Sequence, residues 1–286
     1  MSQPLAYLDP AFLESDEARP IRILTEYLEP LRRFKEQKIQ DTVVFFGSAR
    51  VDSRERAERS LYTMRASGVS DADDHYHNEL QKSRKAVEWA RYYEDARELA
   101  RLVSTWTQSL PSENHRFVVT SGGGPGIMEA ANRGAHEAGG KTIGLNIRLP
   151  FEQGANPYIT EGLHFEFHYF FMRKFWFAYL AKALVVFPGG FGTLDELFEI
   201  LTLVQTDKLS KKIAVVLYGR AYWEQVLDLE PMAEWGAIAE KDLELLHFAD
   251  TPDDAFAHLR DHLTTHHLGP QTPQEAGTPG IAKTRG

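Results

Sequence analysis

The sequence contains no cysteine among its 286 residues. This absence excludes disulfide bonds, thiolate zinc sites, iron–sulfur clusters and cysteine nucleophiles, and it fits a reducing compartment. Basic residues are fewer than acidic ones: the chain has 32 Lys and Arg and 41 Asp and Glu, which gives a formal net charge of −9. Nucleic acids and anionic membranes attract positive surface, so we expect neither as a partner. A local basic pocket for a small anion remains compatible with this charge.

Long hydrophobic runs are missing as well. The most apolar stretch, 169–187, is interrupted by Arg173, Lys174 and Lys182, which argues against a membrane span. The first twenty residues have neither the basic nor the apolar region of a signal peptide, so we expect none. Together these absences predict a cytoplasmic protein.

Three regions of the chain differ in composition. Residues 1–40 are charged and helix-prone, which predicts an N-terminal helical extension. Residues 41–265 alternate short β-branched runs with helical patterns, which predicts a folded domain, and a polar stretch at 51–88 interrupts them and predicts an inserted helical segment. Residues 266–286 are rich in Pro, Gly and Thr without an apolar period, and they predict a disordered tail.

Short apolar runs alternate with helical patterns in the central region. Runs of four to six residues bounded by Gly or Pro are typical of strands buried on both faces of a parallel sheet. The predicted strands are 42–46, 117–120, 142–147, 183–187 and 213–217, with an edge strand at 163–167. The predicted helices are 92–108, 127–138, 170–181 and 194–206, the first of them beginning near Trp89. This alternation predicts a Rossmann-like α/β fold, a doubly wound parallel sheet with helices on both faces.

Glycine-bearing turns follow three of these strands. The carboxyl ends of parallel strands meet at one edge of the sheet, where ligands bind, and glycine lets a ligand approach the backbone. The third turn leads directly into a helix, whose free amides and threonine hydroxyl predict a phosphate site. No lysine follows as in a Walker loop, and the dinucleotide fingerprint is absent, so three generic tight turns remain the alternative. The residues concerned are Gly47, Ser48, Gly122, Gly123, Gly124, Gly189, Gly190, Phe191, Gly192 and Thr193.

Charged residues near these turns carry more information. Two cations, Arg173 and Lys174, begin an otherwise apolar helix, and Glu196 lies three residues after Thr193. The start of that helix and the end of the following strand share one edge of the sheet, so we expect Arg173 and Glu196 to converge. The alternatives are a capping role for Glu196 and snorkelling of the two cations. For the neighbouring acids Asp195 and Glu199 we expect a solvated or capping role.

Several of these residues resemble the motifs of one known family. Residues 188–196, PGGFGTLDE, fit the P-G-G-x-G-T-x-x-E signature of the Lonely Guy (LOG) family. Residues 122–130, GGGPGIMEA, resemble its second glycine motif, Arg173-Lys174 its arginine–lysine pair, and Gly47-Ser48 the turn after its first strand. The resemblance covers about residues 41–220.

The resemblance implies a Rossmann-like fold and hydrolysis of the N-glycosidic bond of a nucleoside 5′-monophosphate. Its plant members release free cytokinin and ribose 5-phosphate, and related members split AMP. It also implies a homodimer or larger oligomer with active sites near the subunit interface, and no cofactor or metal. An older label of the family is lysine decarboxylase, but no lysine of this sequence stands in a recognisable pyridoxal-phosphate context. The N-terminal extension and the 51–88 insertion depart from the short members and leave the identity of the base open.

Under this resemblance, Glu196 and Arg173 are the expected catalytic residues. Glu196 would stabilise an oxocarbenium-like ribose or orient water, and Arg173 would contact the base or phosphate and assist departure of the base. Lys174 would support Arg173 or pair with a carboxylate. Residues 190–193 would hold the 5′-phosphate, and Glu129 a ribose hydroxyl, with a plain helix position as the alternative for Glu129. Thr202 would line the site, with helix packing as the alternative, and Met128 would pack on the base, with core packing as the alternative.

The same residues leave two other classes of function to consider, and they also predict association with a second subunit. A non-enzymatic nucleotide-binding module would share the three loops without a productive acid–cation pair, and a phosphotransferase would need a lysine and metal-binding carboxylates that we do not find. A metal site at His75, His77 and His115 is disfavoured, since no carboxylate stands at helical spacing. The helix 170–181 carries six aromatic residues, more than one sheet face covers, so we expect a second subunit or the 51–88 insertion to cover the rest.

Overall fold

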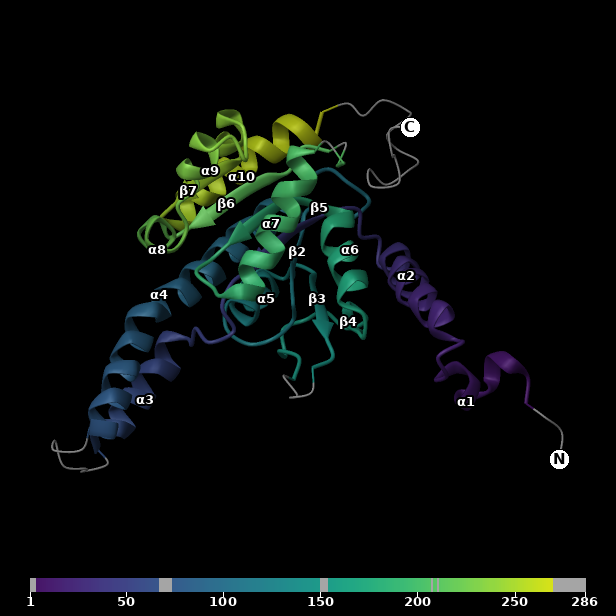
Figure 1. The fold of residues 1–286 in the computed structure, drawn as a ribbon, viewed down its shortest axis with the longest axis horizontal. Coiled ribbons are helices and arrows are strands. Elements are labelled where there is room, and N and C mark those ends of the chain that lie inside the picture. Colours follow the sequence, from purple (N-terminus) through teal and green to yellow (C-terminus); the bar gives the residue numbers. More distant parts are fainter. Residues whose placement is uncertain (1–3, 67–73, 150–153, 207, 210, 270–286) are drawn as a thin grey trace.

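The computed structural model describes residues 4–66, 74–149, 154–206, 208–209 and 211–269. Within these residues seven strands form one parallel sheet in the order β4-β3-β2-β1-β5-β6-β7 (Figure 1). The strands are β1 Thr42–Phe46, β2 Val118–Ser121, β3 Thr142–Ile147, β4 His164–Phe167, β5 Ala181–Val186, β6 Ala214–Tyr218 and β7 Leu246–Ala249. The order reverses at β1, which pairs with β2 on one side and β5 on the other. This is the doubly wound Rossmann-like sheet that the sequence predicts.

Two hydrophobic cores lie on the two faces of this sheet. All five residues of β1 are buried, with Val44 and Phe46 in one core and Val43 and Phe45 in the other. Successive side chains of a strand point to opposite faces, so a central strand must be apolar throughout. This explains why the continuous apolar runs of the sequence mark the strands.

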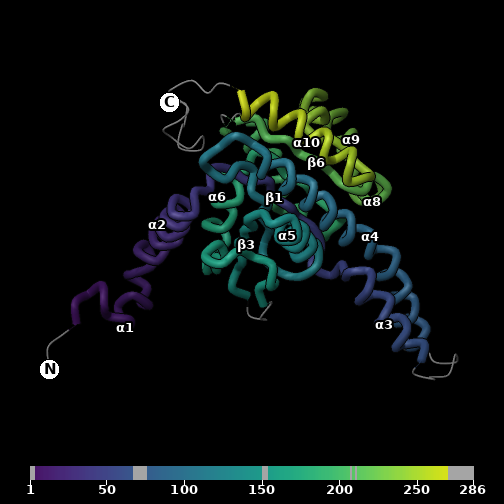
Figure 2. The backbone as a smooth tube through the Cα atoms, turned by 180° about the vertical axis from the view of Figure 1, so that it is seen from behind, coloured from purple at the N-terminus to yellow at the C-terminus, as the bar shows by residue number. Residues whose placement is uncertain are grey.

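Helices cover both faces (Figures 1 and 2). One core includes residues of α2, α6, α7 and α8, and the other includes residues of α4, α5 and α10. The helices are α1 Pro10–Leu13, α2 Arg19–Glu36, α3 Arg54–Ala66, α4 Asp74–Gln108, α5 Ile127–Glu137, α6 Phe170–Leu180, α7 Phe191–Gln205, α8 Arg220–Val226, α9 Glu230–Glu234 and α10 Pro252–His267. Two short 3₁₀ helices, Ala6–Leu8 and Glu240–Leu245, complete the described elements.

The polar segment 51–88 belongs to a helical hairpin. The expectation that the next helix begins near Trp89 is wrong, because α4 begins at Asp74 and runs for 35 residues. Figures 1 and 2 show α3 beside the outer part of α4, with both projecting beyond the sheet. The hairpin projects away from α6 (Figure 1), and α4 and α6 pack into the cores on opposite faces of the sheet. The hairpin therefore does not cover the aromatic residues of α6.

The N-terminal helix α2 covers part of α6 instead. The ring of Tyr27 lies 5.6 Å from that of Phe175 and 5.8 Å from that of Trp176. The indole N–H of Trp176 donates to the Glu26 carbonyl at 2.8 Å. At the start of α6, Phe170 and Phe171 remain 51% and 49% exposed.

The structure differs from the sequence expectations at its C-terminal end. The half-buried edge strand β7 and the short helices α8 and α9 were not predicted. Helix α10 continues to His267, so the disordered tail predicted from residue 266 does not begin there, and residues 270–286 lie outside the described residues. None of the described helices is long and apolar enough to cross a membrane.

Candidate active site

The three glycine-bearing turns meet at the carboxyl edge of the sheet, as the parallel topology predicts. They border a cavity of about 700 Å³. Of the residues proposed from the sequence, those in its walls are Gly47, Ser48, Gly122, Met128, Arg173, Gly189, Gly190, Phe191, Gly192, Thr193 and Glu196. The cavity lies where the strand order reverses, which is the usual ligand site of an open α/β sheet.

Arg173 and Glu196 converge in the wall of this cavity. Arg173 Nη2 donates to Glu196 Oε1 at 3.0 Å, and the two side chains are 16% and 6% exposed. Burial raises the pKa of the Glu196 carboxyl to about 7, although Arg173 and then Lys174 act to lower it. A buried ion pair adds little to stability on balance, so its position in a cavity wall points to chemistry.

The first turn of α6 holds Arg173 beside the cavity. Its guanidinium lies 5.3 Å from the ring centroid of Phe170 and 5.6 Å from that of Phe177. Its Nε is buried and has no hydrogen-bond partner among the described residues. Burial lowers the pKa of Arg173, and the Glu196 carboxylate counters that effect. The unsatisfied N–H is a donor that a bound molecule in the cavity can use.

Glu196 does not cap its helix. Helix α7 begins at Phe191 rather than at the expected Leu194, so Glu196 lies in the second turn and no acid stands in the first. Its partner is Arg173 on the neighbouring helix, not a backbone amide. The capping alternative is therefore wrong for Glu196.

The turn before α7 presents free backbone donors. The amides of Phe191 and Gly192 have no hydrogen-bond acceptor among the described residues, whereas the Thr193 amide donates to the Gly190 carbonyl at 3.0 Å. A Cβ at Gly190 or Gly192 would meet no atom within 4 Å, so both face open space. Free amides and the positive end of the α7 dipole form a site suited to an anion.

Lys174 points away from the cavity. Its Nζ lies 2.8 Å from Asp195 Oδ2 and 2.9 Å from Glu199 Oε2, and it is not among the cavity walls. Of the two roles considered for Lys174, pairing with a carboxylate is the one observed. Asp195 and Glu199 are therefore ion-pair partners, not merely solvated or capping residues.

Four other predicted contacts do not line the cavity. The Glu129 carboxylate is buried and accepts hydrogen bonds from Arg56 of α3 and, at 2.7 Å, from the Tyr93 hydroxyl of α4. The expectation that Glu129 holds a ribose hydroxyl is therefore not supported. Thr202 is exposed and donates to the Phe198 carbonyl of its own helix at 2.7 Å. Thr202 is outside the cavity walls, and its exposure does not support the helix-packing alternative either.

Gly123 and Gly124 also lie outside the walls. Their carbonyls accept hydrogen bonds from the backbone and side-chain nitrogens of Asn156, at 2.8 and 3.1 Å. Gly123 has a φ of +74°, a conformation that favours glycine. These two residues shape the turn that presents Gly122 to the cavity.

Six wall residues were not predicted from the sequence, and three of them carry polar groups that a ligand can contact. These three are Arg50, Trp89 of α4 and Tyr222 of α8, and the other three are Phe46, Ala49 and Phe177. The Tyr222 hydroxyl donates to the Gly189 carbonyl at 2.8 Å, and the Trp89 ring stands 5.6 Å from the Tyr222 ring at 89°. Of these three, only Arg50 had a sequence signal, since it lies two residues after Ser48 in the first glycine-bearing turn. Trp89 and Tyr222 come from segments that spacing alone does not connect to the site.

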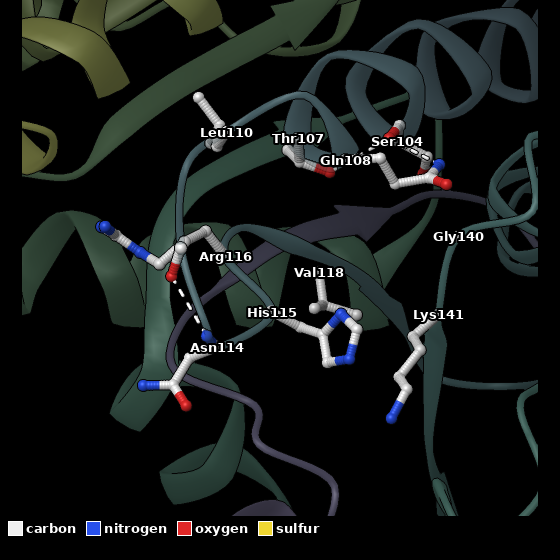
Figure 3. Close-up of a pocket in the computed structure, with 11 residues that line it drawn as sticks. Ser104, Thr107, Gln108, Leu110, Asn114, His115, Arg116, Val118, Gly140 and Lys141 are labelled. Carbon is white, nitrogen blue, oxygen red and sulfur yellow. Dashed lines mark hydrogen bonds between the residues drawn. The ribbon is translucent and has the colours of Figure 1, made fainter.

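A second cavity, of about 270 Å³, opens at the opposite edge of the sheet (Figure 3). It lies between the C-terminal end of α4 and the residues that precede β2 and β3, including His115 and Lys141. None of the three glycine-bearing turns reaches it. His115 stands beyond the C-terminal end of α4 and His77 near its start, which separates them by most of a 35-residue helix. The described residues contain no group of three metal-ligating side chains that could hold an ion.

The chain is similar to one protein-family model and to two solved structures. A family model described as "Possible lysine decarboxylase" matches residues 128–259. Two solved structures are similar: TM1055, at 19% identity over 77% of this chain and 99% of that chain with a TM-score of 0.46, and the Moco carrier protein from Chlamydomonas reinhardtii, at 21% identity over 79% and 99% with a TM-score of 0.44.

Two curated plant proteins are similar in sequence. The cytokinin riboside 5′-monophosphate phosphoribohydrolase LOG of Oryza sativa subsp. japonica is 28% identical over 159 residues, 53% of this chain. The probable enzyme of the same kind LOG6 of Arabidopsis thaliana is 27% identical over 149 residues, 52% of this chain and 74% of that protein. The match spans 62% of the rice protein, less than two thirds of its length. In its glycine signatures, its arginine–lysine pair and these matches, the chain is similar to the LOG proteins.

Proposed function

We propose that this protein hydrolyses the N-glycosidic bond of a nucleoside 5′-monophosphate to give the free base and ribose 5-phosphate. The observation that carries the proposal is the buried Arg173–Glu196 pair in the wall of a cavity that also presents free amides at the start of α7. The names of the plant relatives support the same reaction class. AMP is the substrate we propose first, and a cytokinin riboside 5′-monophosphate the second.

The phosphate orients the substrate in this mechanism. The amides of Phe191 and Gly192, with the hydroxyl of Thr193, bind the 5′-phosphate at the positive end of α7. This places the ribose toward Glu196, which lies on the same helix. Arg173 neutralises Glu196, so the carboxylate does not repel the incoming phosphate.

Bond cleavage then follows the requirements of glycoside chemistry. The C1′–N bond lengthens and positive charge develops on the ribose, where the Glu196 carboxylate stabilises it. Water adds its oxygen to C1′, and one of its protons leaves through Glu196, whose pKa of about 7 suits proton transfer at neutral pH. The departing base takes up one proton from solvent, and Glu196 afterwards returns the proton that it received to solvent. The guanidinium of Arg173 assists the departure of the base through a hydrogen bond. The sum is one water consumed for each base and ribose 5-phosphate released.

A product assay tests the proposal. Purified protein incubated with AMP should release adenine and ribose 5-phosphate in equal amounts, which chromatography and a coupled sugar-phosphate assay measure. Adenosine, which lacks the phosphate, should be a poor substrate. Intact AMP in spite of measurable binding would identify a nucleotide-binding module instead, and equal turnover of adenosine and AMP would remove the phosphate site from the mechanism.

We also propose that the protein works as a homodimer or larger oligomer. Phe170 and Phe171 remain half exposed beside Arg173, and Phe191 at the mouth of the cavity is 93% exposed. Exposed aromatic side chains next to a site favour burial against another protein surface. A second copy packed there would restrict water access to the cavity.

A further inference from the structure

Arg50 is the one cationic side chain in the described walls of the cavity that is not already paired. It is exposed, and its guanidinium has no ion pair or hydrogen bond to another described residue. The other cation in the walls, Arg173, is bound to Glu196, and neighbouring Lys174 is bound to Asp195 and Glu199. A guanidinium held in a cavity without a partner retains its full capacity to bind an anion.

The backbone fixes Arg50 next to the glycine turn that precedes α7. The Ser48 amide donates to the Pro188 carbonyl at 3.0 Å, which ties the turn after β1 to the turn after β5. The Arg50 amide donates to the Ser48 hydroxyl at 3.1 Å, so Arg50 follows a tight local turn. In addition, the Ile127 amide donates to the Ser48 carbonyl at 3.1 Å. The position of Arg50 therefore depends on three elements of the sheet edge, not on a loose loop.

The charge balance of the site requires such a cation. A 5′-phosphate carries close to two negative charges at neutral pH, whereas a helix N-terminus offers the equivalent of only about half a positive charge. Arg173 is largely neutralised by Glu196 at 3.0 Å. The Arg173–Glu196 pair therefore adds little net charge to the cavity, and Arg50 supplies positive charge beyond that of the α7 N-terminus.

Two aromatic residues shield the same cavity. Trp89 and Tyr222 stand edge to face, and the Tyr222 hydroxyl anchors the pair to the Gly189 carbonyl. Trp89 comes from α4, whose N-terminal half belongs to the segment that departs from the short family members. The two rings therefore add an apolar wall to the cavity that Arg50 also lines.

We propose that Arg50 is a specificity-determining residue that binds the 5′-phosphate together with the amides of α7 and so selects nucleotides over nucleosides. This inference rests on the proposed function for the orientation of the substrate. Arg50 takes no part in cleavage of the C1′–N bond. It contributes binding energy for the phosphate, and the phosphate in turn positions C1′ beside Glu196.

Calorimetric titration of AMP and adenosine into wild type and variants tests this role. Arg50→Gln should weaken AMP binding by about 10- to 100-fold and leave adenosine binding unchanged, because a charge-assisted hydrogen bond to a phosphate is lost. Arg50→Lys should recover part of the loss, since it restores the charge but not the planar fork. Arg54→Gln is the matched control: Arg54 is an exposed arginine four residues away, outside the cavity walls, and this variant should bind AMP as wild type does.

The readout separates this inference from the proposed reaction, because binding is measured without turnover. If wild type binds AMP but releases no adenine, the proposed function fails while the Arg50 comparison still decides its role. Unchanged AMP affinity in Arg50→Gln would overturn the inference, and so would equal losses for AMP and adenosine. No binding of AMP by wild type would overturn both.

Discussion

Glu196 should titrate near neutral pH, and two neighbouring charges should move that titration in opposite directions. Burial raises the pKa of Glu196 to about 7, Lys174 acts to lower it, and Glu199 acts to raise it. The proposed mechanism uses the carboxylate form. We therefore expect kcat/KM for AMP to rise with pH through about 7 and to level off above it.

The informative perturbation is Glu199→Gln, which removes a negative charge one helical turn from Glu196. Side chains three apart on a helix lie about 6 Å from each other, and a screened interaction at that distance is about 0.7 kcal/mol in a water-like medium. Glu199 is 31% exposed and Glu196 only 6%, so the water-like value is the lower end of the range. Since 1.36 kcal/mol corresponds to one pKa unit, the midpoint should fall by at least about half a unit. Lys174→Gln removes a positive charge and should raise the midpoint.

The assay is the pH dependence of kcat/KM between pH 5 and pH 9 for wild type and both variants. Neither Lys174 nor Glu199 lines the cavity, so both variants should keep substantial activity. Asp261→Asn on α10, an exposed acid on the other side of the sheet, is the control and should leave the midpoint unchanged. Midpoints that shift in the same direction for both variants, or not at all, would refute the assignment of this titration to Glu196.

Three further outcomes follow from the geometry. Gly192→Val should weaken AMP binding by at least about tenfold with an unchanged melting temperature, because its side chain enters open cavity space. Gly189→Ala should instead lower the melting temperature, because its Cβ would overlap Thr193. Equal AMP affinity of Gly192→Val and wild type would exclude a phosphate at Gly192. Burial lowers the pKa of His267 to about 3, below its unfolded value of 6.5, so the unfolded state binds a proton more readily than the folded state. The free energy of unfolding, measured with urea, should therefore fall by about 2 kcal/mol from pH 7.5 to pH 5. A His267→Gln variant with the same pH dependence as wild type would contradict this. Size-exclusion chromatography should show a dimer or larger that Phe171→Glu shifts toward a monomer, and a wild-type monomer at micromolar concentration would count against the proposed assembly.

The sheet and the convergence of Arg173 with Glu196 follow from sequence patterns. Strands β1 and β3 begin and end where the apolar runs do, since both strands are buried on both faces. The topology of a parallel sheet brings Arg173 and Glu196 together although 23 residues separate them. Both inferences depend on local pattern and on a general rule of topology.

Other parts of the site depend on contacts that no local pattern shows. Glu129 has an early-helix position suited to a substrate contact, yet Arg56 from the projecting hairpin occupies its carboxylate. Trp89 lies in the middle of α4 and in the cavity wall, and the polar first half of α4 did not predict one continuous helix from Asp74. Similarly, β7 is a half-buried edge strand of mixed composition, so it lacks the continuous apolar run of the central strands.

The most direct test of the proposed chemistry compares AMP binding and AMP cleavage in Glu196→Gln. The variant keeps the size of the side chain and a hydrogen-bond acceptor for Arg173, but it removes the carboxylate that stabilises the ribose cation. We expect calorimetric AMP affinity within a few fold of wild type and a kcat for adenine release lower by roughly 10²-fold or more. Turnover by Glu196→Gln at the wild-type rate would contradict the catalytic role of the Arg173–Glu196 pair.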